Sequence, residues 1–111
     1  MSVFNLKDIK RINIEIGESG DLRNESSISF ALSIIKEKKS WLFELSYLVR
    51  SLLIDHPFID GNKRTAFVLA TLYFNDNKIG YDNNKLVESI LKIAKKNIKD
   101  INKIARLLIK C

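Results

Sequence analysis

The chain has few of the residues that mark secreted, zinc-binding or membrane proteins. Its one cysteine, Cys111, excludes an internal disulfide and cannot make a zinc site. The longest nearly apolar run, Ala66–Phe74, has nine residues, whereas a bilayer-spanning helix needs about 20. The sequence begins Met-Ser-Val-Phe-Asn, without a basic segment followed by an apolar one, so it shows no signal peptide. We therefore expect a cytoplasmic protein without membrane contact.

Residues that interrupt helices are also scarce, because 111 residues contain one proline and four glycines. Apolar residues recur with helical spacing, and β-branched alternation is nearly absent. The length suits one small core, so we predict a single domain over residues 1–111, an all-α bundle of about six helices. The expected N-caps are Asn5, Ser26 or Ser27, Ser40, Asn83 or Asn84, and Asp100. Residues expected to face the core include Ile28, Ile35, Leu45, Leu86, Val87, Leu91 and Ile104.

The fourth helix should be the centre of the bundle. Its segment Thr65–Phe74 is apolar on every face, which is typical of a buried helix. The third helix should end near Asp55, because Pro57 disfavours a helical conformation at the residue before it. One long C-terminal helix stays an alternative to two. We favour a break at residues 96–99, because Asn97 would otherwise face the core.

The chemistry-bearing residues gather directly before the central helix, in the run His56-Pro-Phe-Ile-Asp60-Gly61-Asn62-Lys63-Arg64-Thr65. Gly61 allows a tight turn and a close approach by a ligand. The first-turn N–H groups that follow, from Asn62 onward, have no intrahelical partners, and the helix dipole favours an anion there. Lys63 and Arg64 add two cations, and the guanidinium suits bidentate phosphate contact. These residues predict a phosphate site.

Two further residues in this run can support chemistry at a bound phosphate. Asp60 offers the hard oxygen ligand that Mg²⁺ prefers. His56 is the one histidine of the chain and can accept a hydroxyl proton near neutral pH. Structural interpretations stay open for each alone: a packing histidine, an aspartate N-cap and a solvated basic turn. Cations at a helix N-terminus oppose the dipole, however, so their presence favours an anion that joins them.

This run resembles the signature of the Fic/Doc family, roughly H-P-F-x-D-G-N-[GK]-R, at nine consecutive positions. Residues 20–25, followed by Ala31 and Leu32, look like the family's G-x-R-[DN]-E…A-L segment. The resemblance implies the helical Fic fold and a site for ATP with Mg²⁺. The implied roles are a general base at His56, a Mg²⁺ ligand at Asp60, a phosphate cradle at Gly61 and Asn62, and a phosphate clamp at Arg64.

Two positions distinguish the branches of this family. Adenylylating Fic enzymes usually have glycine where Lys63 stands and a second arginine where Phe67 stands. Both departures favour the death-on-curing branch, which has N-K-R. Proteins of that branch look like toxins that phosphorylate a translation elongation factor. We therefore expect transfer of the γ-phosphate of ATP to a protein hydroxyl, with adenylyl transfer as the alternative.

The resemblance also implies a regulator. Autoinhibited Fic proteins carry an S/T-x-x-x-E-[GN] helix, and the nearest match here is Ser40–Glu44, which Leu45 follows. Leu45 fits the core face of the third helix, so we identify no internal inhibitor and expect an antitoxin in trans. A short flap for target docking is expected near residues 36–40, where a solvated turn is the alternative.

A basic nucleic-acid-binding module is the competing hypothesis. The formal net charge is +6, and residues 78–111 carry nine basic and three acidic residues, whereas residues 1–77 are balanced. Such asymmetry can indicate contact with nucleic acid or a membrane surface. Amphipathic helices place lysine opposite the core in any case, and no aromatic residue is interleaved to stack bases. We therefore disfavour nucleic acid as a partner, and we disfavour an inactive Fic-like protein because no required motif position is missing.

Overall fold

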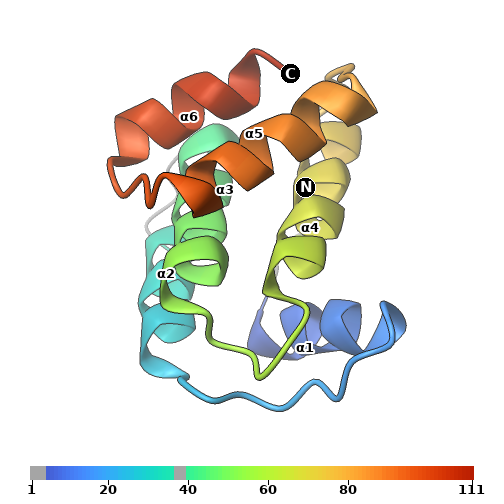
Figure 1. The fold of residues 1–111 in the computed structure, drawn as a ribbon, viewed down its shortest axis with the longest axis vertical. Coiled ribbons are helices and arrows are strands. Elements are labelled where there is room, and N and C mark those ends of the chain that lie inside the picture. The colour runs from blue at the N-terminus through green and yellow to red at the C-terminus, as the bar shows by residue number, and fades with distance from the viewer. Residues whose placement is uncertain (1–4, 37–39) are drawn as a thin grey trace.

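The computed structural model describes residues 5–36 and 40–111 and shows an all-α arrangement (Figure 1). Its helices are α1 (Leu6–Glu15), α2 (Ser26–Lys36), α3 (Trp41–Arg50), α4 (Asn62–Asp76), α5 (Asn83–Lys95) and α6 (Ile101–Ile109). The helices α2, α3 and α4 stand side by side, α1 packs on α4, and α5 and α6 lie across α4 and α3. The predicted bundle of about six helices is confirmed. Over the described ranges, no helix is long and apolar enough to cross a membrane.

Three helix starts have the predicted caps. Asn5 Oδ1 accepts a hydrogen bond from the Asp8 N–H at 2.9 Å, and the Asp8 carboxylate accepts one from the Asn5 N–H at 3.0 Å. This reciprocal capping box fixes the start of α1. Ser40 caps α3 through the Phe43 N–H, and Asp100 caps α6 through an N–H in its first turn.

The other two cap predictions are wrong by one or two residues. Ser26 is already the first helical residue of α2. Its N–H and its hydroxyl both donate to the side-chain oxygen of Asn24. Asp82 caps α5 by accepting from the Lys85 N–H at 3.0 Å, in place of Asn83 or Asn84. Asparagine and aspartate compete for such positions on nearly equal terms, so sequence alone leaves the choice open.

The predicted third helix reaches Asp55, but its last five residues form a π-helix, η1 (Ser51–Asp55). It ends at His56, which adopts a left-handed conformation with φ 47° and ψ 63°. Pro57 excludes helical continuation there, as expected. Single π-turns inside helices occur often at functional sites, and this one comes directly before the predicted base.

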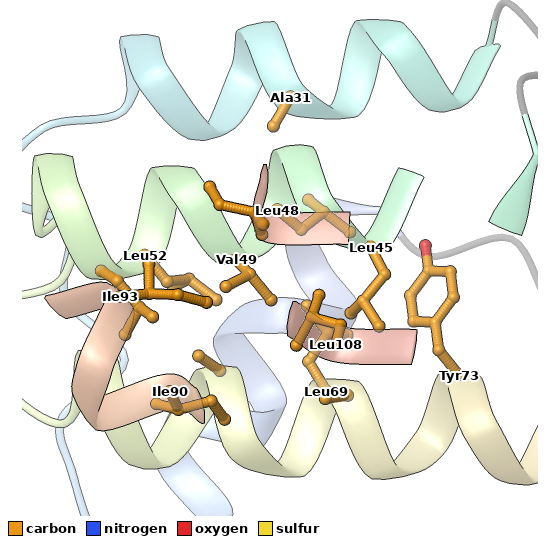
Figure 2. Close-up of a cluster of buried hydrophobic side chains, with 14 of the residues drawn as sticks. Ala31, Leu45, Leu48, Val49, Leu52, Leu69, Tyr73, Ile90, Ile93 and Leu108 are labelled. Atoms are coloured by element: carbon orange, nitrogen blue, oxygen red, sulfur yellow. The ribbon is translucent and has the colours of Figure 1, made fainter. Parts of the chain in front are cut away.

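The core is built from all six helices, and α4 supplies its middle. Figure 2 shows part of this cluster between α3, α4 and the C-terminal helices. The side chains labelled there are Ala31, Leu45, Leu48, Val49, Leu52, Leu69, Tyr73, Ile90, Ile93 and Leu108. The predicted core positions Ile28, Leu86 and Ile104 are also fully buried. The side chain of Ile35 lies outside the described residues.

The expectation that α4 is buried on every face needs correction. Leu69, Ala70 and other residues of its inner face are fully buried, but Phe67 and Val68 on its outer face are only partly buried. Val87 and Leu91 of α5 were expected to cover the core, yet they are 41% and 50% exposed. The apolar faces of α4 and α5 are therefore wider than the surface over which the two helices pack, so part of each face stays in contact with solvent.

The break between the last two helices is confirmed. The helix α5 ends at Lys95, and Asn97 adopts a left-handed conformation with φ 53°. Asparagine tolerates this conformation better than most residues. The turn lets Ile98 enter the core at 7% exposure, while Asn97 itself stays exposed.

Candidate active site

The motif loop, residues 56–61, connects η1 to α4 and is held in place by the segment 21–24. The N–H groups of Arg23 and Asn24 both donate to the Pro57 carbonyl, at 2.7 and 3.1 Å, and an isolated β-bridge joins Leu22 to Phe58. The Phe58 side chain is fully buried, so it anchors the loop in the core. Backbone pairing and one aromatic anchor therefore fix the loop's path.

Asn62 clamps the loop from inside. Its side-chain oxygen accepts from the Phe58 N–H at 3.0 Å, and its amide nitrogen donates to the Phe58 carbonyl at 3.1 Å. The residue is 8% exposed. The Asn62 side chain is thus committed to the loop, and its contribution to an anion site would come from its backbone N–H.

Asn13 is a second organising residue, which the sequence analysis missed. It is 1% exposed at the end of α1, and its amide nitrogen donates to the Asp60 carbonyl at 2.9 Å and to the Thr65 hydroxyl at 3.1 Å. Its oxygen accepts from the Gly20 N–H at 2.9 Å. One buried amide therefore joins α1, the following turn, the motif loop and α4. Its partners lie up to 52 positions away, so no local pattern identifies it.

The start of α4 has the geometry of an anion site. Its N-cap is Gly61, with φ 77° and no side chain to accept a hydrogen bond. The first intrahelical bond runs from Thr65 to Gly61, so the N–H groups of Asn62, Lys63 and Arg64 lack intrahelical acceptors. Both cationic side chains are exposed. Their charge opposes the helix dipole unless an anion lies between them.

All six predicted site residues line one open hollow, which we call the phosphate hollow, of about 380 Å³. They are His56, Asp60, Gly61, Asn62, Lys63 and Arg64, and the other lining residues are Glu18, Arg23 and Ile59. The structure thus brings the predicted residues together and adds Glu18 and Arg23. Arg23 belongs to the segment 20–25, which resembles a family motif, but the sequence pattern predicts no role for this arginine.

Arg23 holds the backbone of the candidate base. Its Nη2 donates to the His56 carbonyl oxygen at 3.1 Å, across 33 positions of sequence. The His56 side chain is exposed and lines the phosphate hollow. Because Arg23 fixes the peptide that follows a left-handed residue, it restricts the directions in which the imidazole can point.

Asp60 is exposed, and one of its oxygens accepts from the Gly61 N–H at 2.8 Å. Among the described residues, no three histidine, cysteine or acidic side chains gather to hold a metal ion. A protein-only metal cage is therefore not formed there. Mg²⁺ bound with a nucleotide needs only one or two carboxylates besides phosphate oxygens and water, so Asp60 fits that use.

Two further hollows adjoin the phosphate hollow. The apolar groove, of about 410 Å³, lies between α4 and α5. Its lining residues are Ile16, Lys63, Arg64, Phe67, Val68, Val87, Ile90 and Leu91. The Lys95 hollow, of about 550 Å³, is lined by His56, Lys63, Leu91, Ala94 and Lys95. Lys63 therefore borders all three hollows, whereas His56 borders the phosphate hollow and the Lys95 hollow.

The nearest match to an inhibitory helix lies elsewhere. Glu44 is 2% exposed on α3, and burial raises the pKa of its carboxyl above the ordinary value. Burial also raises the pKa of Tyr73, with smaller contributions from the Glu44 and Asp76 carboxylates. Tyr73 extends from α4 toward α3 (Figure 2) and lies nine residues beyond Arg64, about 13 Å along the helix axis. Glu44 is therefore directed at the far part of α4.

The expected flap falls partly on residues 37–39, which lie outside the described residues. Of its flanks, Lys36 ends α2 and Ser40 caps the start of α3. His56 follows the other end of the continuous α3–η1 segment, so these flanks are separated from the motif loop by the length of that segment (Figure 1).

Comparison with known protein families identifies a relative family for this chain. The model of the Fic/DOC family matches residues 3–74, which include α1 to α4 up to Phe74 and the whole motif loop. A comparison with curated proteins finds no significant match. The match covers most of the chain, so the protein belongs to the Fic/DOC family, and this membership indicates a Fic-type transferase.

Proposed function

We propose that this member of the Fic/DOC family transfers the γ-phosphate of ATP to a hydroxyl group of a target protein. The observation that carries the proposal is the phosphate hollow, where the uncapped start of α4, two cations, a carboxylate and an imidazole converge. Phosphoryl transfer depends mainly on positioning and charge neutralisation, and these groups supply both.

The start of α4 would bind the transferred phosphate. The uncapped N–H groups of Asn62, Lys63 and Arg64 would donate to the anion, and the guanidinium of Arg64 would clamp two of its oxygens. Lys63 adds a point charge from the same turn. Asp60 would hold Mg²⁺, which when bound neutralises charge on the phosphate oxygens. In this arrangement each group would lie where negative charge accumulates during transfer.

His56 would act as the general base. Its imidazole nitrogen takes the proton of the acceptor hydroxyl as the oxygen forms a bond to the γ-phosphorus. The bond between that phosphorus and the bridging oxygen breaks, and ADP leaves with the electron pair. The products are a phosphorylated protein, ADP and the proton on His56, which passes to solvent. The acceptor is the hydroxyl of a serine, threonine or tyrosine side chain, and a translation elongation factor is the target that the family resemblance favours.

The base and ribose of ATP would lie in the apolar groove. This groove shares Lys63 and Arg64 with the phosphate hollow, and its remaining lining residues are apolar. Ligand sites of this kind combine apolar walls with a few placed polar groups. Phe67 stands in this groove where adenylylating relatives have a second arginine, so that arginine's phosphate contact is absent. This difference, together with Lys63, favours γ-phosphoryl transfer over adenylyl transfer.

Labelled ATP separates the two reactions. Purified chain, Mg²⁺ and a cell lysate are incubated with ATP carrying label at the α- or the γ-phosphate. We expect protein labelling from the γ-position alone; labelling from the α-position alone would establish adenylyl transfer, and labelling from neither would refute both. His56→Ala should reduce labelling at least 100-fold while preserving helicity, because the side chain is exposed. Arg11→Ala, an exposed residue of α1 outside the phosphate hollow, is the matched control.

An unrestrained enzyme of this kind would damage its host, so we propose an antitoxin in trans. Glu44, the acidic residue of the nearest inhibitor-like segment, is buried against the far part of α4 and does not line the phosphate hollow. Regulation would then come from a separate chain. Co-expression with a neighbouring reading frame should restore growth that the wild-type chain suppresses, and His56→Ala should suppress no growth.

A further inference from the structure

We propose that the Lys95 hollow binds the acceptor segment of the target and selects an acidic residue beside the modified hydroxyl. This inference rests on the proposed function and names the substrate class of the same site. The inference is based on the residues that line the hollow, which are His56, Lys63, Leu91, Ala94 and Lys95. The hollow therefore lies between the candidate base and the last turn of α5.

The acceptor is assigned to this hollow by elimination. A general base must lie within hydrogen-bond reach of the hydroxyl it deprotonates, so the acceptor has to approach His56. His56 borders two hollows, and the phosphate hollow is the one with the uncapped helix start, Arg64 and Asp60. The apolar groove does not include His56. With phosphates in the first and the nucleoside in the second, the Lys95 hollow remains for the acceptor.

The charge of this hollow gives the chemistry of its occupant. Lys63 and Lys95 both line it, and none of the acidic side chains that the structure describes does. Lys63 faces the phosphate hollow as well, so its charge is shared with the nucleotide. Lys95 is exposed and does not line the phosphate hollow, so its ammonium group is free to attract a carboxylate of the acceptor segment. Leu91, 50% exposed, adds an apolar contact beside it.

The single histidine makes this proposal measurable without knowledge of the target. Histidine-labelled protein gives one imidazole spin system, which belongs to His56. The chain is loaded with Mg²⁺ and β,γ-imido ATP, so that the phosphate hollow is filled. It is then titrated with the peptide acetyl-Glu-Asp-Ser-Asp-Glu-amide, or with the same peptide carrying lysine at each acidic position. We expect a saturable shift of the His56 signals with the acidic peptide alone.

Two charge-reversal variants locate the effect. Lys95→Glu should weaken the binding of the acidic peptide about fivefold or more. Loss of one exposed ion pair lowers affinity by up to about fivefold, and this variant also replaces the attraction with repulsion. Lys92→Glu is the matched control, because it makes the same charge change in the same last turn of α5 and does not line the hollow. It should bind the acidic peptide as the wild type does.

Several outcomes would overturn the inference: equal shifts from both peptides, no shift from either, or equal weakening by both variants. Acidic-peptide binding that β,γ-imido ATP abolishes would also overturn it, because the peptide would then occupy the phosphate hollow. These results are distinct from failure of the proposed function. A chain that binds the acidic peptide through Lys95 but transfers neither ATP label would refute the phosphotransferase alone.

Discussion

Replacement of Asn62 by alanine tests whether this residue serves the loop or the phosphate. Its side chain makes both of its described hydrogen bonds with the backbone of Phe58, at 3.0 and 3.1 Å. The residue is 8% exposed and Phe58 is fully buried, so water has little access to the groups that would be left behind. Asn62→Ala should therefore destabilise the fold as well as the active site.

The size of the effect follows from the groups left unpaired. A buried donor or acceptor that loses its partner costs about 1–3 kcal/mol, and Asn62→Ala leaves one of each on Phe58. We expect the free energy of unfolding to fall by about 2–4 kcal/mol. For a domain of this size the total is about 5–15 kcal/mol. The loss is thus a large share of the stability and should lower the urea midpoint by about 1–2 M.

The assay is urea denaturation followed by circular dichroism. Asn75→Ala is the matched control, because Asn75 is an exposed residue in the last turn of the same helix. It should change the free energy of unfolding by about 0.5 kcal/mol or less. If Asn62→Ala kept the wild-type midpoint and lost only ATP affinity, its side chain would act on phosphate and the clamp interpretation would be refuted.

Three further substitutions test other parts of the site and the core. Arg23→Ala should lower the kcat of label transfer about tenfold without changing the urea midpoint, because the guanidinium fixes the His56 carbonyl. Arg23→Lys should restore part of the lost kcat. An unchanged kcat in Arg23→Ala would contradict this role. Gly61→Ala should lower the free energy of unfolding by about 1–3 kcal/mol, because φ is 77° and the new Cβ would lie 2.6 Å from Glu18 Cγ. Gly80→Ala is the control and should lower it little, because no described atom lies within 4 Å of the new Cβ. Glu44→Gln should remove a pH dependence of stability. Because burial raises the pKa of the Glu44 carboxyl, the free energy of unfolding of the wild type declines as pH rises from about 4.5 through the pKa of this group in the folded state. Parallel curves of stability against pH for the two proteins would refute this.

The helices and the position of the motif follow from local chemistry. Helical spacing of apolar residues, glycine at Gly61 and proline at Pro57 are enough to place α4 and the loop before it. The left-handed Asn97 and the helix break around it follow from the conflict between its polarity and the apolar phase. These predictions succeed because each depends on residues within one or two helical turns.

The residues that complete the site depend on contacts between distant segments. Asn13 reaches Asp60 and Thr65 across 47 and 52 positions, and Arg23 reaches His56 across 33. A buried asparagine inside an amphipathic helix has no local signature that distinguishes it from an exposed one. Nor does the sequence show where α3 changes to the π-helix η1, since Ser51–Asp55 continues the same apolar pattern.

The apolar groove shows a different limit of periodicity. The spacing of Val87 and Leu91 places them correctly on the apolar stripe of α5, but a stripe indicates only which face avoids water in the folded chain. The partly buried Phe67 and Val68 of α4 line the same groove. Because the apolar faces of α4 and α5 are wider than the surface over which these helices pack, apolar side chains stay exposed beside the phosphate hollow. Such a surface is typical of a ligand or partner site.

The charge asymmetry can now be divided into two parts. All nine basic residues of 78–111 are exposed, and a diffuse surface of this kind attracts any polyanion through screened, non-specific contacts. Lys95 differs from its neighbours because it lines a hollow together with His56. If the charge acted only as a diffuse surface, Lys92→Glu and Lys95→Glu would weaken the binding of any anion equally, DNA included. A selective effect of Lys95→Glu on an acidic peptide, with both variants alike toward DNA, would connect one residue of the basic third to the chemistry of the motif loop.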